Sequence, residues 1–294
     1  MPKSKRTKRK APVTAPSTSS APVVQRSSNP AATRKVIRRF HVLLKRQAHI
    51  KRVLSSSSPA NKDLLVELVS VEDEMERMGG LAAYQRMSTI GQGNDRGGGS
   101  EKVLVQWLRE LNVHENRTGV KLSVRSRLLE VGALKPNNYA FCSSWIDCCP
   151  IDLHSQHPAI MEQDFLLLPE DENRSKWDII SLSLVLNFVP EPKDRGRMLR
   201  LAYSMLRDNG YLFVALPLPC VMNSRYLTED LFNELMEYLS FKRLNARWKD
   251  GGKMVYWLYQ KCGGPTSERR GANLKFEVKT VLRQGNRNNF TILL

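Results

Sequence analysis

From residue 122 onward, apolar runs of strand composition alternate with amphipathic segments of helical period. The order closes with FKRLNARWKDGGKMVYWLYQK, two strand-like runs joined at Asp250-Gly251-Gly252, as in a hairpin. Strands separated by helices favour parallel pairing, whereas a hairpin forces antiparallel pairing. The sequence therefore predicts an α/β fold with a doubly wound, mostly parallel sheet and an antiparallel C-terminal strand. Ligands of such sheets bind at the carboxyl ends of the strands.

Capping and turn residues predict where individual elements begin and end. The apolar run from Asp178 to Pro190 has strand composition, and the amphipathic helix after it is expected to close at Asn209-Gly210. Thr228 and Ser100 are the expected N-caps of two other helices. The glycines between Gly91 and Gly99 are either a flexible linker or a backbone that approaches a phosphate or substrate.

The positive charge lies mostly at the two ends of the chain. Of the net charge of +17, residues 1–62 carry +16 and residues 265–294 carry +4, so the part between them carries −3. We expect a disordered basic tail over 1–34, a helical extension over 35–99, the α/β domain over 100–262 and a basic tail over 263–294. Within the extension, 35–54 and 60–78 have helical periodicity. The first of these two helices is basic, and it either packs against the body or grips RNA backbone.

The basic leader and the cysteines indicate where the protein works. The run KSKRTKRK is typical of nuclear or nucleolar addresses and of polyanion contacts, although it could also be a solvated end. Its clustered charges, with no apolar face between them, disfavour a mitochondrial presequence. Five cysteines without CxxC spacing suit reduced thiols, and His154 and His157 have no second ligand pair. We expect no metal and no membrane span.

Three acids follow consecutive predicted strands. Glu130 ends the first strand, Asp152 ends the second and Asp164 lies near the third. Asp152 stands about 20 residues beyond the first turn, where a ribose-binding carboxylate sits in nucleotide folds. Solvated loop acids are the alternative, but three acids at successive strand ends favour a nucleoside cofactor.

The turn after the first strand narrows the choice of cofactor. EVGALKPNN offers the single glycine Gly132, whereas a pyrophosphate needs a G-x-G-x-x-G turn. NAD and FAD are therefore disfavoured. S-adenosylmethionine has no phosphate, and it needs one close backbone approach, an acid for its ribose and an acid near its adenine. Gly132, Asp152 and Asp164 match these needs.

Longer stretches of the chain resemble a known family. GGLAAYQRMSTIGQG, RGGGSEKVLVQWL, LLEVGAL, PIDLHSQHPAIMEQDFLLLP and the segment from WDIISLSLVLNFVP to CVMNSRY together resemble the fungal 25S rRNA adenine-N1 methyltransferases, over roughly residues 79–262. The resemblance implies a class I, Rossmann-like methyltransferase fold, S-adenosylmethionine as cofactor and a nucleolar location. It places cofactor contacts at Gly132 and Asp152.

A related group of S-adenosylmethionine sensors suggests further cofactor contacts at Arg86, Asp164, Phe165 and Ser183. Arg86 would bind the cofactor's carboxylate, or it is a plain surface cation. Gly99 stands where the family pattern has an acid, which leaves the role of that loop open.

Adenine N1 chemistry makes modest demands on side chains. N1 of neutral adenine carries a free lone pair, so attack on a sulfonium methyl group needs positioning more than a strong base. N1 also lies on the Watson–Crick edge, so the target base must be unpaired or flipped out. Asn187 and Phe188 follow the fourth strand and could bond and stack the base, or they are a turn residue and a core residue. The sequence indicates no other catalytic residue.

Three functions remain open at this point: a methyltransferase acting on large-subunit rRNA or a pre-ribosomal particle, a non-catalytic S-adenosylmethionine sensor, and an RNA-binding assembly factor. The basic leader favours an RNA substrate over a sensor, because a sensor has no reason to carry +16 on one arm. If the arm grips phosphates, RNA binding should weaken steeply as the salt concentration rises. We expect a monomer.

Overall fold

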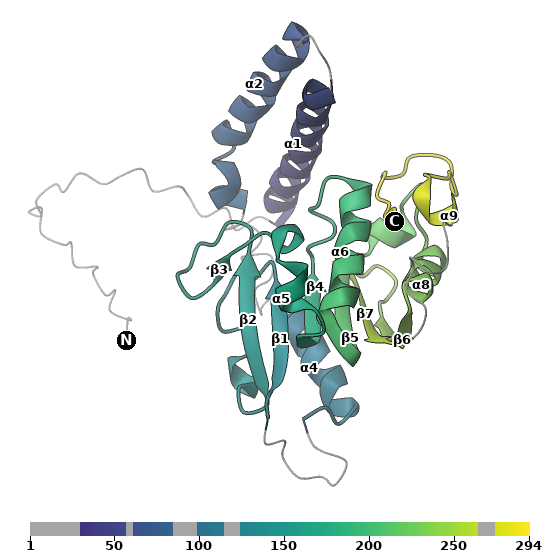
Figure 1. The fold of residues 1–294 in the computed structure, drawn as a ribbon. Helices are drawn as coiled ribbons and strands as arrows, with labels where there is room; N and C mark the ends of the chain where they lie inside the picture. The colour runs from purple at the N-terminus through teal and green to yellow at the C-terminus, as the bar shows by residue number, and fades with distance from the viewer. Residues whose placement is uncertain (1–29, 57–60, 85–98, 115–123, 264–273) are drawn as a thin grey trace, which may run out of the picture.

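The structure, a computed structural model, describes residues 30–56, 61–84, 99–114, 124–263 and 274–294. A seven-stranded sheet of order β3-β2-β1-β4-β5-β7-β6 forms its centre (Figure 1). The strands are β1 (Ser126–Val131), β2 (Ile146–Asp152), β3 (Met161–Glu162), β4 (Trp177–Ser183), β5 (Leu206–Pro217), β6 (Phe241–Arg247) and β7 (Met254–Lys261). The first five pair in parallel, and β7 is antiparallel to both β5 and β6. The doubly wound α/β prediction is confirmed, and the closing hairpin inserts β7 between β5 and β6.

Helices cover both faces of the sheet. They are α4 (Ser100–Glu110), α5 (Glu170–Asn173), α6 (Pro192–Met205), α7 (Pro219–Met222), α8 (Glu229–Tyr238) and α9 (Leu274–Glu277), with short 3-10 turns η2 (Ala140–Cys142) and η3 (Phe165–Leu167). Successive strand residues point to opposite faces, so Leu128 packs with α4 whereas Leu129 packs with α6 and α8. The sheet therefore separates two apolar cores.

The chain switches from helix to strand earlier than expected after α6. The helix ends at Met205, and Asn209-Gly210 lies inside β5 instead of closing the helix. Asn209 adopts a left-handed φ of 62° there, and the pairing register with β4 shifts over this stretch. The turn residues therefore make an irregularity within the strand. In the sequence, the same two residues look like the end of a helix.

Two other boundaries differ from expectation and one agrees with it. The β4 strand ends at Ser183, because Leu184 turns the backbone into the left-handed region with φ 59°. Gly99, with φ 113°, occupies the N-cap position of α4, and Ser100 is the first helical residue. Thr228 caps α8 as predicted, since its Oγ1 accepts a hydrogen bond of 3.1 Å from the Leu231 N–H.

A helical hairpin stands over the carboxyl edge of the sheet (Figure 1). It consists of α1 (Pro30–Ser56) and α2 (Lys62–Arg77), each within a few residues of its predicted ends. Ion pairs of 2.5 Å join Arg39 to Glu74 and Arg46 to Glu67 across the two helices. Leu43, Ile50 and Val71 form a small apolar cluster of their own between them. The hairpin therefore has internal packing that does not depend on the sheet.

The C-terminal segment packs against the body from Leu274 onward, although its composition predicts a basic tail. Phe276, Phe290 and Ile292 are buried in the same core as α6 and α8. The buried Arg195 donates through Nε to the carbonyl of Val189 at 2.8 Å, and it also donates through Nη1 to the carbonyl of Thr291. This guanidinium thus ties the C-terminal segment to the loop after β4. Within the described residues, no helix is both long and apolar enough to cross a bilayer.

Candidate functional site

Most of the predicted cofactor residues meet in one cavity at the carboxyl ends of β1, β2 and β4. This cavity, of about 510 Å³, is lined by Gly132, Asp152, Asp164, Phe165 and Ser183. Its size falls within the range of small-molecule sites, and its lining mixes apolar side chains with a few polar groups. The sixth predicted residue, Arg86, lies outside the described residues, as do Gly91 to Gly98.

Gly132 makes the turn that leads the chain out of β1. Its φ of 74° lies in the left-handed region, and a Cβ there would stand 2.9 Å from Cγ2 of Val185. Its N–H donates to the carbonyl of Ile151 at 2.8 Å, which holds the turn against β2. A side chain at this position would strain the backbone and crowd the cavity wall, so glycine leaves a cradle where a ligand can approach the main chain.

The two aspartates of the cavity are held by backbone N–H groups. Oδ1 of Asp152 accepts from the His154 N–H at 2.9 Å. Oδ1 of Asp164 accepts from the Leu166 N–H at 2.8 Å and caps η3. These bonds fix the direction of both carboxylates before any ligand arrives. Phe165, next to Asp164, is buried among core residues, so its ring also supports the cavity floor.

Ser183 links β4 to α4 at the edge of the cavity. Its Oγ donates to Oγ of Ser100 at 2.7 Å. The sequence pattern predicts only a helix N-cap at Ser100. The structure places the Ser100 hydroxyl beside Ser183, a predicted cofactor residue. This contact joins the start of α4 to the end of the central strand.

Glu130 faces the other side of the sheet and does not line the cavity. Its Oε1 accepts from Nδ2 of Asn138 at 2.7 Å, and its Oε2 lies 3.8 Å from Sγ of Cys148. Burial raises the pKa of Glu130 to about 7, and the hydrogen bond from Asn138 opposes that shift in part. The strand-end acid is therefore a buried structural group between β1, β2 and the segment after β1.

This burial predicts a pH-dependent stability that Glu130→Gln removes. The pKa of Glu130 is about 7 when folded, against an ordinary 4.5 when unfolded. Between these pH values the unfolded chain releases a proton that the folded chain keeps, so stability falls as pH rises, by about 3 kcal/mol in total. Urea unfolding should give a lower free energy of unfolding at pH 8 than at pH 5 for the wild type and for the exposed control Glu76→Gln. Glu130→Gln should lack this drop. Equal drops in all three proteins would contradict this account of Glu130.

The helical hairpin supplies part of the cavity wall, which the sequence does not predict. Six residues of the hairpin and of the helical turn after it line the cavity: Phe40, Leu44, Gln47, Met75, Leu81 and Tyr84. The first three recur at helical spacing along α1. That spacing predicts a buried face but does not say what the face covers.

An aromatic cluster closes the cavity on this side. The Phe188 ring stacks on His41 with centroids 4.2 Å apart and meets Tyr84 edge-on at 5.2 Å. Asn187, beside it, is 7% exposed, and its Oδ1 has no hydrogen-bond partner among the described residues. Of the predicted base-binding pair, Phe188 therefore lines the cavity, whereas Asn187 is buried and is not among the lining residues.

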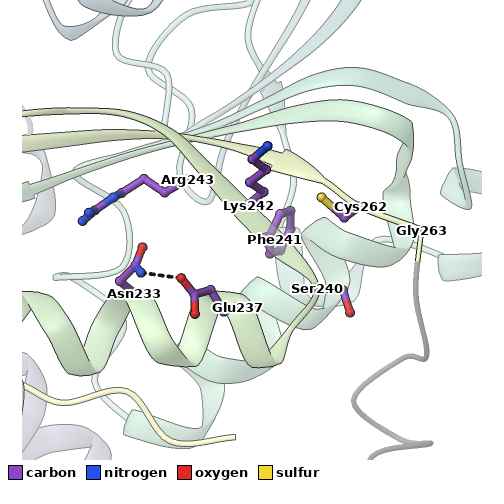
Figure 2. A pocket seen from close by; sticks show the side chains of 8 residues that line it. All are labelled: Asn233, Glu237, Ser240, Phe241, Lys242, Arg243, Cys262 and Gly263. Carbon is purple, nitrogen blue, oxygen red and sulfur yellow. Dashed lines mark hydrogen bonds between the residues drawn. The ribbon is translucent and has the colours of Figure 1, made fainter.

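A second hollow lies between α8 and β6, at the far edge of the sheet (Figure 2). It measures about 480 Å³, and Lys242, Arg243, Cys262 and Glu237 are among its lining residues. Glu237 accepts a hydrogen bond of 2.7 Å from Nδ2 of Asn233 on the same helix. None of the strand-end acids lines this hollow, so we place the site in the cavity at the carboxyl edge.

Metal binding has no support among the described residues, where no group of three His, Cys, Asp or Glu side chains could hold an ion. His154 and His157 are both exposed, and Nδ1 of His157 accepts from the Ala159 N–H at 3.1 Å. A local turn therefore uses this histidine.

Comparisons with known proteins identify a family for the chain. Residues 69–292 match the family of 25S rRNA (adenine(2142)-N(1))-methyltransferases, Bmt2. The 25S rRNA adenine-N(1) methyltransferase of Schizosaccharomyces pombe is 34% identical over 263 residues, which cover 88% of this chain and 90% of the relative. The 25S rRNA (adenine(2142)-N(1))-methyltransferase of Saccharomyces cerevisiae is 34% identical over 222 residues, 74% of this chain and 62% of the relative.

Solved structures show weaker likeness. A SAM-dependent methyltransferase from Archaeoglobus fulgidus has a TM-score of 0.40 at 12% identity, covering 56% of this chain and 95% of that one. The N-methyltransferase NodS from Bradyrhizobium japonicum, in complex with S-adenosyl-L-homocysteine, has a TM-score of 0.36 at 12% identity, covering 53% and 86%.

Proposed function

Because the chain belongs to the family of 25S rRNA (adenine(2142)-N(1))-methyltransferases, we propose that it methylates N1 of an adenine in large-subunit rRNA, with S-adenosylmethionine as methyl donor. The observation that carries the proposal is the cavity at the carboxyl edge. It brings together Gly132, Asp152, Asp164 and Ser183, which come from separate segments of the sequence and suit one phosphate-free nucleoside.

Each polar group of the cavity has a role that its position supports. The Asp152 carboxylate, at the end of β2, would accept hydrogen bonds from the two ribose hydroxyls of the cofactor. Asp164 would accept from its adenine amino group, and Gly132 and Ser183 would hold the rest of it. Arg86, a further predicted contact, lies outside the described residues. The bound cofactor supplies an electrophilic methyl group on a positively charged sulfur.

The reaction requires positioning and a place for positive charge. With the cofactor bound, methyl transfer to the N1 lone pair would leave the neutral thioether as leaving group and a positive charge on the methylated base. Aromatic faces attract cations, and Phe188 and Tyr84 present such faces in the cavity wall. No proton transfer is needed before the methyl group moves.

The cysteines support transfer to nitrogen over a covalent mechanism with a thiolate. Burial raises the pKa of Cys142 to about 11 and that of Cys220 to about 12, and it raises the pKa of Cys148 further. None of the five cysteines lines the cavity. A thiol that stays protonated at neutral pH is a poor nucleophile. The site therefore suits a substrate atom with its own lone pair.

The proposal extends to partners and location. The leader, with +16 over residues 1–62, suits RNA phosphates and nuclear or nucleolar import, so we include RNA binding, a role in rRNA processing and a nucleolar location. The substrate is the rRNA or a pre-ribosomal particle, and the protein acts as a monomer.

Methyl transfer with purified protein tests the proposal. Large-subunit rRNA lacking the modification is incubated with radiolabelled S-adenosylmethionine, and the nucleosides are then separated. We expect label in 1-methyladenosine. The control is an RNA with 1-deazaadenosine at the adenosine that takes up the label. This base lacks the accepting nitrogen, so no label should appear at that position. Tight cofactor binding without transfer to any RNA would instead favour the sensor function.

A further inference from the structure

The His41–Phe188 contact has the geometry of a stacked base. Among the ring pairs of the described residues it has the shortest centroid separation, 4.2 Å, with an angle of 30° between the planes. An imidazole is a flat ring of carbon and nitrogen, like the five-membered half of a purine. Burial and the charge of Lys45 lower the pKa of His41 to about 4, so the ring is neutral at physiological pH, as adenine is. A neutral heteroaromatic ring thus lies on the face of the side chain best placed to hold the target base.

The stack lies beside the cavity, because Phe188 lines the cavity and His41 packs on the Phe188 ring. Phe188 follows β4 by five residues and lines the same cavity as Asp152 and Ser183. The only other ring that meets Phe188 within the described part of the chain is Tyr84, at an angle of 66°. His41 therefore covers one face of Phe188, and a flipped base needs such a face for stacking.

The described apolar side chains of α1, the helix that carries His41, belong to neither core of the sheet. The hairpin of α1 and α2 has its own apolar cluster and its own ion pairs. An exposed ion pair of 2.6 Å from Arg52 to Glu191 is one polar link between α1 and the body. Exposed ion pairs contribute little to stability. The ring of His41 can therefore leave Phe188 while the two cores of the sheet stay intact.

Cations flank His41 on the same face of α1. Arg38 and Lys45 stand three residues before it and four after it, and neither forms an ion pair with the described residues. Partial burial, followed by the positive charge of Arg195, lowers the pKa of Lys45, and Lys279 acts in the same direction. Several positive charges without a paired carboxylate suit the phosphates on either side of a flipped nucleotide.

We propose that His41 occupies the target-base subsite of the RNA-free protein, and that a flipped adenine binds by replacing it on the face of Phe188. This inference rests on the proposed function for the identity of the base. The exchange is favourable, because an imidazole stack contributes roughly 2- to 10-fold to an equilibrium whereas a base stacked on an aromatic ring contributes roughly 5- to 150-fold.

The direction of the effect of His41→Ala tests the proposal. Removing the competing ring should lower the KM for large-subunit rRNA by roughly 2- to 10-fold and leave cofactor affinity unchanged. His41→Trp should raise the KM, because a larger ring competes better. The matched control is His49→Ala, a histidine two turns further along α1 that makes no ring contact with Phe188. In a Phe188→Ala background, His41→Ala should change the KM no further. A higher KM for His41→Ala, or an effect that persists without Phe188, overturns the proposal.

A second measurement needs no substitution and no methyl transfer. A ten-nucleotide oligo(A) is added to the wild-type protein, and reaction of each histidine with diethyl pyrocarbonate is mapped by mass spectrometry. Displacement predicts that His41 becomes more reactive as RNA is added, and unchanged or lower reactivity overturns it. A rise in His41 reactivity in a protein that methylates no RNA would support the subsite and refute the proposed function, so the two failures are distinguishable.

Discussion

Replacing Asp152 by alanine is expected to abolish S-adenosylmethionine binding while RNA binding through the basic leader survives. The carboxylate stands at the end of β2, with one oxygen held by the His154 N–H at 2.9 Å. Two ribose hydroxyls on one carboxylate contribute about 1.5–3 kcal/mol each, so its loss should weaken binding at least about 100-fold. Isothermal titration calorimetry with S-adenosylmethionine measures the change.

The matched control is Asp147→Ala on the same strand. Asp147 is exposed at the other end of β2, where it pairs with Arg125 at 3.4 Å. An exposed pair of this kind contributes little, so both stability and cofactor affinity should stay near the wild type. If Asp152→Ala binds S-adenosylmethionine with unchanged affinity, this cavity is not the cofactor site.

The second large effect is expected from Gly196→Ala, which should displace the C-terminal segment. A Cβ on Gly196 would stand 1.9 Å from the carbonyl oxygen of Leu293, a backbone atom that cannot turn aside. Overpacking a core typically costs 1–3 kcal/mol, and a backbone clash lies at or above the upper end, so we expect about 3 kcal/mol. For a domain of this size that lowers Tm by roughly 6–12 °C.

Activity should fall in Gly196→Ala as well. The neighbouring Arg195 joins Thr291 to the carbonyls of Val189 and Pro190, directly after Phe188. Loosening this link frees the loop that carries the base-stacking ring. The control is Gly263→Ala, since no atom lies within 4 Å of the added Cβ there. If thermal unfolding gives the same Tm for Gly196→Ala and Gly263→Ala, the C-terminal segment is not held in this position.

The sheet and its acids were predictable because both depend on local pattern. Apolar runs, turn residues and a closing hairpin fix the α/β class, and strand ends place Gly132, Asp152 and Asp164 on one edge. Glu130 shows the limit of this reasoning. Side chains alternate along β1, so the Glu130 side chain lies on the face of the sheet opposite the cavity. Which face holds the cavity follows only from how β1 pairs with its neighbouring strands.

The hairpin over the cavity and the docking of the C-terminal segment were not predictable from pattern. The spacing of Phe40 and Leu44 indicates a buried helix face whether it packs on the body or on another helix. In the C-terminal segment, a basic residue that the composition assigns to a tail has a structural role. Arg283 donates to the carbonyls of Met222 at 2.8 Å and Leu227 at 2.6 Å, so a residue counted as tail charge instead holds two parts of the fold together. Long-range contacts of this kind leave little signal in composition.

Mapping N1-methyladenosine in large-subunit rRNA tests the central claim most directly. A strain of the source organism that lacks this chain should lose one such modification, and the wild-type chain should restore it. Chains carrying Asp152→Ala should be expressed at normal levels without restoring it, whereas Asp147→Ala should restore it. An unchanged modification profile in the deletion strain would contradict methylation of this rRNA.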